Sequence, residues 1–173
     1  MTPILWRQAT PADAPALAVL GGATFLASFA HDHPGPALIA HIRNAHDESA
    51  YRAALVDPAR QVWIGETPLG APVGYAMLTP PDLPVEIDER QDVEIKRFYL
   101  LGPWQGGGNG DALMGTVLDQ ARLRGARRVL LAVYPANDRA RRFYARHGFE
   151  EIGETTFMVG EEAFRDLIYA RIL

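Results

Sequence analysis

The sequence of 173 residues has no cysteine, which excludes disulfide bonds, thiolate zinc sites, iron–sulfur clusters and cysteine nucleophiles. It also lacks an uninterrupted run of the roughly 18–20 apolar residues that a membrane-spanning helix needs. The first eight residues have neither the basic start nor the apolar stretch of a signal peptide. We therefore expect a cytoplasmic protein that does not associate with membranes.

Positive charge is also scarce, because 17 Lys and Arg residues stand against 21 Asp and Glu residues, for a formal net charge of -4. A surface that follows the phosphates of DNA or RNA requires a basic stripe, so we expect no nucleic-acid partner. With 48% hydrophobic and 22% charged residues, the composition is that of an ordinary soluble domain. The whole chain, residues 1–173, is predicted to form a single domain.

Strand-like and helix-like segments alternate along the chain, which predicts an α/β fold. Pro34 and Pro36 are expected to break the helical pattern, and residues 31–60 are expected to form a surface region with one or two short helices. Helices are predicted at 10–29, at 111–124 and after Asn137. Strands are predicted at 4–8, 61–66, 71–80, 93–101, 129–134, 151–158 and 165–173.

Four glycines, Gly106, Gly107, Gly108 and Gly110, lie between a predicted strand and a predicted helix in the segment WQGGGNGDALM. Such a junction presents unpaired N–H groups and the positive end of the helix dipole, which together bind anions such as phosphates. No lysine follows as in GxxxxGK[ST], and Asp111 replaces the third glycine of GxGxxG. The alternative is a flexible turn that binds nothing.

Two motifs in order resemble those of the GNAT superfamily of N-acetyltransferases. Residues 105–110, QGGGNG, resemble the pyrophosphate-binding pattern [QR]-x-x-G-x-[GA], and residues 137–149, NDRARRFYARHGF, are similar to N-x-x-A-x-x-F-Y-x-x-x-G-F. The strand EIKRFYL at 94–100 adds to the likeness. The resemblance implies a central mixed, mostly antiparallel sheet of six to seven strands with a splayed parallel pair, flanked by about four helices.

By this resemblance, the protein is an enzyme that binds acetyl-CoA, its acyl donor, where strands 93–101 and 129–134 separate. The glycines let the backbone approach the pyrophosphate, and the strand edge pairs with the pantetheine arm and polarises the acetyl carbonyl. Asn137 contacts this arm or only caps a helix. The implied cofactor-binding residues are Phe98, Tyr99, Leu100, Gln105, Gly106, Gly107, Gly108, Asn109, Gly110, Asp111, Asn137, Ala140 and Phe143.

The resemblance further implies that an amine attacks the thioester directly. Glu94 is the candidate base, acting directly or through a chain of water molecules, and Tyr144 is the candidate acid that protonates the departing thiolate. The structural alternatives are a solvated strand residue for Glu94 and simple packing on an apolar helix face for Tyr144.

One departure from the family pattern reduces the positive charge at the loop, because Gln105 and Gly107 occupy positions where relatives carry basic residues. Arg139, Arg141 and Arg142 compensate, or they form a solvated basic face. A second cluster contains His31, His33, His41 and His46. Its irregular spacing does not favour a metal site, so we expect no metal and interpret the cluster as part of the acceptor wall.

Residues 157–169 and 24–29 resemble the bacterial spermidine/spermine N-acetyltransferases, so a polyamine is the favoured amine acceptor. The acidic residues Asp82, Glu86, Asp88 and Glu89 fit a polycation, or they form an ordinary solvated loop. Two alternatives are acetylation of a protein N-terminus or lysine, and a non-catalytic sensor that binds coenzyme A or acyl-CoA. The resemblance leaves a homodimer open.

Overall fold

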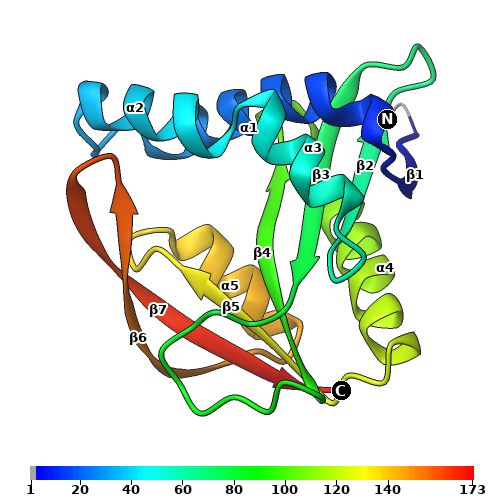
Figure 1. Ribbon diagram of the computed structural model, residues 1–173, viewed down its shortest axis with the longest axis vertical. Coiled ribbons are helices and arrows are strands. Elements are labelled where there is room, and N and C mark those ends of the chain that lie inside the picture. Colours follow the sequence, from blue (N-terminus) through cyan, green and yellow to red (C-terminus); the bar gives the residue numbers. More distant parts are fainter. Residues whose placement is uncertain (1–2) are drawn as a thin grey trace.

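The computed structural model describes residues 3–173, so Met1 and Thr2, which the predicted domain includes, lie outside the described part. Within residues 3–173, seven strands form one sheet in the order β1-β2-β3-β4-β5-β7-β6 (Figure 1). Neighbouring strands are antiparallel except β4 and β5, which are parallel. The predicted mixed, mostly antiparallel sheet with one parallel pair is confirmed.

The predicted strands all occur in the described part, with ends that differ by a few residues. They are β1 (Leu5–Gln8), β2 (Gln61–Glu66), β3 (Pro72–Thr79), β4 (Asp92–Leu100), β5 (Arg128–Val133), β6 (Glu150–Val159) and β7 (Glu162–Ile172). The helices are α1 (Ala14–Phe29), α2 (Gly35–Ala45), α3 (Glu48–Val56), α4 (Asn109–Leu123) and α5 (Asp138–Arg146), with short 3-10 turns at η1 (Pro11–Asp13) and η2 (Gly102–Trp104). Residues 3–173 thus contain five α-helices, where about four were expected.

Alternating residues of the central strands point to two different helical layers. On β2, Val62 and Ile64 pack into the core cluster that contains α1 and α3, whereas Trp63 packs into the cluster that contains α4. On β3, Tyr75 joins the first cluster and Ala76 the second. The period of two along each strand therefore places α1 and α3 on one face of the sheet and α4 on the other.

The segment between α1 and β2 differs from its prediction. Pro34 is the N-cap of α2 and Pro36 lies in its first turn, where a missing N–H costs no hydrogen bond, so these prolines begin a helix. The segment is also more than a surface region, because Leu38 and Tyr51 are buried in the core. Their burial explains why two ordered helices form here.

Helix α1 corrects the expectation about apolar runs. The helical stretch Pro11–Phe29, 19 residues with a mean hydropathy of 1.4, is long and apolar enough to cross a membrane by length and composition. Its several alanines contribute to this hydropathy, and the larger side chains Leu17, Leu20 and Phe25 are buried inside the protein. We interpret it as a core helix.

The parallel strands β4 and β5 pair only at one end. Asp92–Glu94 pair with Arg128–Leu130, and both strands then continue without pairing to each other. A register shift opposite Met77 and Leu78 leaves Lys96 as an extra residue on β4. Figure 1 shows the two strands together near the C-terminus and apart at their far ends, so the predicted splay is present.

An ion pair joins the two strands where they still pair. The Arg128 guanidinium donates to the Asp92 carboxylate, which also accepts from the Asp88 N–H at 2.8 Å. Burial alone would raise the pKa of Asp92, but Arg128 and the Asp88 N–H together hold it below its ordinary value of 3.8. This interaction therefore stabilises the fold above pH 3.8 and is lost as the pH falls through the lower folded-state pKa.

We predict that Asp92→Asn lowers the free energy of unfolding at pH 7 by about 1–3 kcal/mol, because the half-buried Arg128 loses its anion. Urea unfolding measures this change. The control Asp119→Asn removes an exposed ion pair on α4 and should cost less than about 0.5 kcal/mol. Equal effects of the two substitutions would contradict the proposed role of Asp92.

Candidate active site

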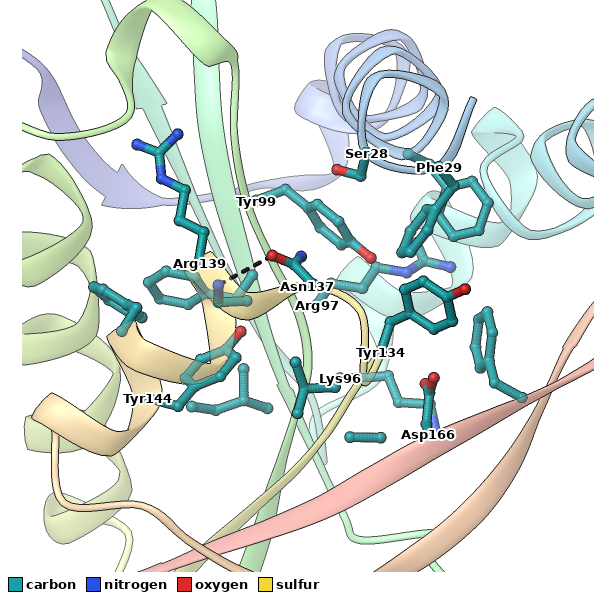
Figure 2. Close-up of a pocket in the computed structure, with 18 of the residues that line it drawn as sticks. Ser28, Phe29, Lys96, Arg97, Tyr99, Tyr134, Asn137, Arg139, Tyr144 and Asp166 are labelled. Atoms are coloured by element: carbon teal, nitrogen blue, oxygen red, sulfur yellow. Dashed lines mark hydrogen bonds between the residues drawn. The ribbon is translucent and has the colours of Figure 1, made fainter. Parts of the chain in front are cut away.

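A cleft of about 770 Å³ opens where β4 and β5 separate. Its walls come from β4 and β5, from the loop before α4, from α5, from the C-terminal part of α1 and from β6 and β7. Figure 2 shows labelled side chains from α1, β4, α5 and β7 around one space. The splay of the parallel pair therefore creates the hollow that forms the candidate site.

The glycine loop forms one end of the cleft. Gly106, Gly107 and Gly108 have φ angles of 92°, 59° and 85°, a left-handed conformation that other residues adopt only at a cost. A Cβ at Gly106 or Gly108 would meet no protein atom within 4 Å, whereas at Gly110 it would lie 3.1 Å from Phe143. The loop thus needs glycine for its backbone twist, and Gly110 for its packing on α5.

The loop ends in the N-terminus of α4, with Gly108 as the N-cap. Within residues 3–173, the Gly110 and Asp111 N–H groups make no backbone hydrogen bond, while the Asn109 N–H bonds to the Gly106 carbonyl at 3.2 Å. Free N–H groups at the positive end of a 15-residue helix attract phosphate oxygens. This end of the cleft fits the pyrophosphate of coenzyme A.

The strand edge next to the loop also fits the coenzyme. Beyond Glu94, β4 is paired with β3 but not with β5, which leaves one edge of residues 95–100 open along the cleft. An open edge pairs with an extended chain that carries amide groups, such as the pantetheine arm.

Basic side chains from α5 reach the same end. Arg139 and Arg142 line the cleft, as does Arg146, which also pairs with Asp111 at 3.1 Å. Arg141 instead bonds to the Tyr169 hydroxyl and does not line the cleft. The structure thus brings two of the three suggested compensating arginines to the cleft.

Most residues predicted to contact the coenzyme lie on the cleft surface. Gly107 and Asn109 are the exceptions, and the Asn109 side chain bonds to the Trp104 carbonyl at 3.0 Å, which holds the loop. Gln105 has a similar role, because its amide donates to the Leu100 carbonyl at 2.8 Å. The predicted residues on the cleft are Glu94, Phe98, Tyr99, Leu100, Gln105, Gly106, Gly108, Gly110, Asp111, Asn137, Ala140, Phe143 and Tyr144.

Asn137 both caps a helix and lies on the cleft surface, where a contact with the coenzyme arm is possible. Its Oδ1 accepts a hydrogen bond from the Ala140 N–H at 3.0 Å and so caps α5 (Figure 2). The residue also lines the cleft. The cap fixes the side chain and leaves its amide group beside the space that the coenzyme would occupy.

Tyr144 lies on α5 with its ring among aromatic neighbours. The ring centroids of Phe143 and Phe149 are 5.5 and 5.8 Å away, and the hydroxyl points into the cleft (Figure 2). Burial, together with a smaller effect of Tyr99, raises the pKa of Tyr144 well above its usual value. The phenol therefore stays protonated at neutral pH and can donate a proton to a thiolate of the coenzyme.

Glu94 lies at the closed end of the splay and is only 2% exposed. One carboxylate oxygen accepts from the Asp82 N–H at 2.8 Å, and the other is 3.1 Å from the Lys96 ammonium. Glu94 lines the cleft, as a base for the reaction must. Its role as base stays a prediction. The geometry adds that Glu94 holds the start of the loop between β3 and β4 in place.

The end of the cleft opposite the glycine loop has aromatic walls. His33 stacks on Phe164 with ring centroids 3.8 Å apart, and Arg97 lies over the Tyr51 ring at 4.7 Å. Burial, then Arg97 and His41, lowers the pKa of His46 to about 3. The aromatic side chains on this part of the cleft surface are Phe25, Phe29, Tyr99, Tyr134, Phe157 and Phe164.

The four clustered histidines are divided between the cleft and a second, smaller hollow. His33, His41 and His46 line the cleft, in agreement with an acceptor wall, whereas His31 lies in a neighbouring smaller hollow. His33 Nδ1 is 2.6 Å from Asp32, and His46 Nδ1 is 2.9 Å from the Tyr51 hydroxyl. In the part of the chain described, no group of three or more His, Asp or Glu side chains has an arrangement that could hold a metal ion.

Asp166 is a site residue that the sequence pattern did not single out. It lies on β7, is 8% exposed and lines the cleft opposite Tyr144 (Figure 2). Burial, opposed by a smaller effect of His33, raises the pKa of Asp166 to about 6. The sequence signal for Asp166 was weak, because only the pairing of β7 with β5 and β6 brings this carboxyl into the cleft.

Comparisons with solved structures define the class. The fold is similar to that of the PaiA N-acetyltransferase from Thermoplasma acidophilum in complex with coenzyme A, with a TM-score of 0.81, 15% identity and 99% of each chain covered. It is also similar to the ribosomal-protein-alanine N-acetyltransferase from Brucella melitensis, with a TM-score of 0.71 and 26% identity over 98% of this chain and 99% of that chain. The architecture is that of the acetyltransferases.

Sequence comparison then gives the family. Residues 25–149 match the model of the Acetyltransferase (GNAT) family. An uncharacterized N-acetyltransferase from Mycobacterium bovis is 40% identical over 139 residues, which cover 80% of this chain and 84% of that protein. The chain belongs to the GNAT family and is an acetyl-CoA-dependent N-acetyltransferase.

We predict that Tyr144→Phe lowers kcat by about tenfold or more, because the thiolate leaves without a proton donor. Acetyl-CoA affinity, measured by calorimetry, should stay unchanged, since the ring keeps its packing. Tyr169→Phe is the matched control, because it removes a buried hydroxyl on β7 that does not line the cleft. An unchanged kcat in Tyr144→Phe would remove the phenol from the reaction.

Proposed function

We propose that the enzyme acetylates the primary amine of a small molecule. The observation that carries this proposal is the enclosure of the acceptor end of the cleft. The Tyr134 hydroxyl donates to Asp32 at 2.9 Å, which joins the end of β5 to the connection between α1 and α2. Gly160, in the turn between β6 and β7, packs so tightly on α2 that a Cβ would lie 3.1 Å from the Ala37 carbonyl oxygen.

These two contacts close the acceptor end on two sides. A small amine fits such a pocket, whereas a protein segment requires a groove that is open along its length. Figure 1 shows the β6–β7 hairpin rising next to α2, which agrees with the second contact. The enclosure therefore favours a small acceptor over a folded protein.

The side chains of the cleft supply the proton transfers that the reaction needs. A free amine with a pKa near 10 is mostly protonated at neutral pH, so it must lose a proton before its nitrogen attacks the thioester carbonyl. Among residues 3–173, Glu94 and Asp166 are the buried carboxylates on the cleft surface. The Tyr144 phenol supplies the proton that the sulfur takes up as the carbon–sulfur bond breaks.

Polyamines are the acceptors that we would test first within this class. Asp82 and Asp166 both line the cleft and would provide two carboxylates for a dication. Arg97 lies in the same cleft and opposes a longer polycation. Charge therefore supports a short amine with one or two ammonium groups.

A peptide N-terminus is the second candidate. It is favoured by the likeness to the Brucella melitensis protein, whose name specifies acetylation of a ribosomal-protein alanine. A flexible N-terminus can enter an enclosed pocket where a folded segment cannot.

We predict that the enzyme releases free thiol from acetyl-CoA when a small primary amine is added. The assay uses a panel of spermidine, spermine, 2-phenylethylamine, amino acids, aminoglycosides and a short alanine peptide, with calorimetry of acetyl-CoA binding in parallel. The expected result is turnover with a small amine and little with the peptide. Turnover confined to the peptide would contradict the proposal, and coenzyme binding without turnover on any amine would favour a sensor.

A further inference from the structure

We propose that Asp166 binds the ammonium group of the acceptor and takes the proton that this group loses before attack. This inference rests on the proposed function and deepens it, because it names the residue that recognises the amine. The acceptor class that follows is a primary amine on an unbranched or aromatic carbon skeleton.

The first argument is that Asp166 lacks a cation. It is 8% exposed, yet within residues 3–173 no side chain forms an ion pair with it. A buried carboxylate without a partner is costly, so one that lines the cleft is suited to a cation from outside. The other buried carboxylates are paired inside the protein, namely Asp13 with Arg7, Asp92 with Arg128 and Glu94 with Lys96.

The second argument is the surroundings of the carboxyl. Phe164, two residues earlier on β7, lines the cleft, and its ring stacks on His33 and meets Tyr134 edge to face with centroids 6.4 Å apart. Phe29 meets Tyr134 at 5.9 Å. Such rings accommodate methylene groups or another ring, and they stabilise a nearby ammonium through cation–π attraction.

The charged and titratable groups around Asp166 come from several elements. His33 and Asp32 come from the connection before α2, Tyr134 directly follows β5, and Tyr99 and Lys96 come from β4. Lys96 is held by Glu94 and His33 by Asp32, so both cations already have a carboxylate. From β6, the neutral Thr155 lies directly opposite Asp166. None of these groups removes the need for an external cation.

The proton balance of the reaction is simple. One N–H bond of the ammonium breaks, and its proton forms an O–H bond on Asp166. The nitrogen lone pair then forms a bond to the thioester carbon, and the carbon–sulfur bond breaks with its electrons moving to sulfur. The sulfur takes its proton from the Tyr144 phenol. The nitrogen loses its excess proton, which returns through solvent to Tyr144 and restores the phenol. Asp166 then releases its proton to water.

The pH dependence follows from the charge of the carboxyl. Because burial raises the pKa of Asp166 to about 6, the carboxyl becomes neutral as the pH falls below that value. A neutral carboxyl neither attracts the ammonium nor accepts its proton. Activity with a saturating coenzyme should therefore fall below about pH 6 in the wild-type enzyme.

The test is the isosteric variant Asp166→Asn. We expect kcat/KM for the amine to fall about 100-fold or more, acetyl-CoA affinity to stay unchanged, and the activity loss near pH 6 to disappear. The matched control, Glu162→Gln, removes one negative charge from an exposed position on the same strand and should behave as wild type. The Asp166→Asn variant should unfold at no lower temperature than wild type at pH 8, because it no longer buries an ionised carboxylate.

Binding of the probes 2-phenylethylamine and spermidine, measured by calorimetry with coenzyme A present, separates the two proposals. If a probe binds the wild type and binds Asp166→Asn at least tenfold more weakly, the inference is supported. If no amine is turned over in that case, only the proposed function fails. Equal binding and equal kcat/KM in the two proteins would overturn the inference. Absence of binding of both probes to wild type would overturn it as well.

Discussion

The short pairing between β4 and β5 is the constraint on which the rest of the site depends. The strands share hydrogen bonds only from Asp92 to Glu94, where the Arg128 ion pair joins them, and then diverge. Because they diverge, the edge of β4 is open to an extended ligand, and the N-terminus of α4 faces the same space. The predicted anion site, the candidate proton donor Tyr144 and the proposed acceptor pocket are all arranged around this opening.

Local patterns predicted most of the fold. The β-like segments 61–66 and 71–80 predicted the strands β2 and β3, and the motifs around Gly108 and Asn137 identified the starts of two helices. The prolines were misread because Pro34 and Pro36 serve equally well to break a helix or to begin one. Only the burial of the following residues, which is a tertiary effect, decides between these outcomes.

The acceptor end could not be predicted in the same way, because its residues meet only in the folded chain. Asp166 and His33 are separated by most of the sequence, and their relation depends on β7 returning beside β5. Glu94 had a stronger sequence signal, yet its carboxylate is engaged by Lys96 and the Asp82 N–H. An unpaired buried carboxylate reduces stability above its pKa, and this cost is expected where a charge serves binding rather than folding.

All of these site assignments require that the coenzyme occupies the opening between the two strands. Amide hydrogen exchange, followed with and without coenzyme A, tests this claim most directly. We expect added protection of residues 95–100 and of the loop 105–111, with little change at 92–94 and 128–130, which are already paired. Protection confined to other parts of the chain, or a uniform change across the sheet, would contradict it.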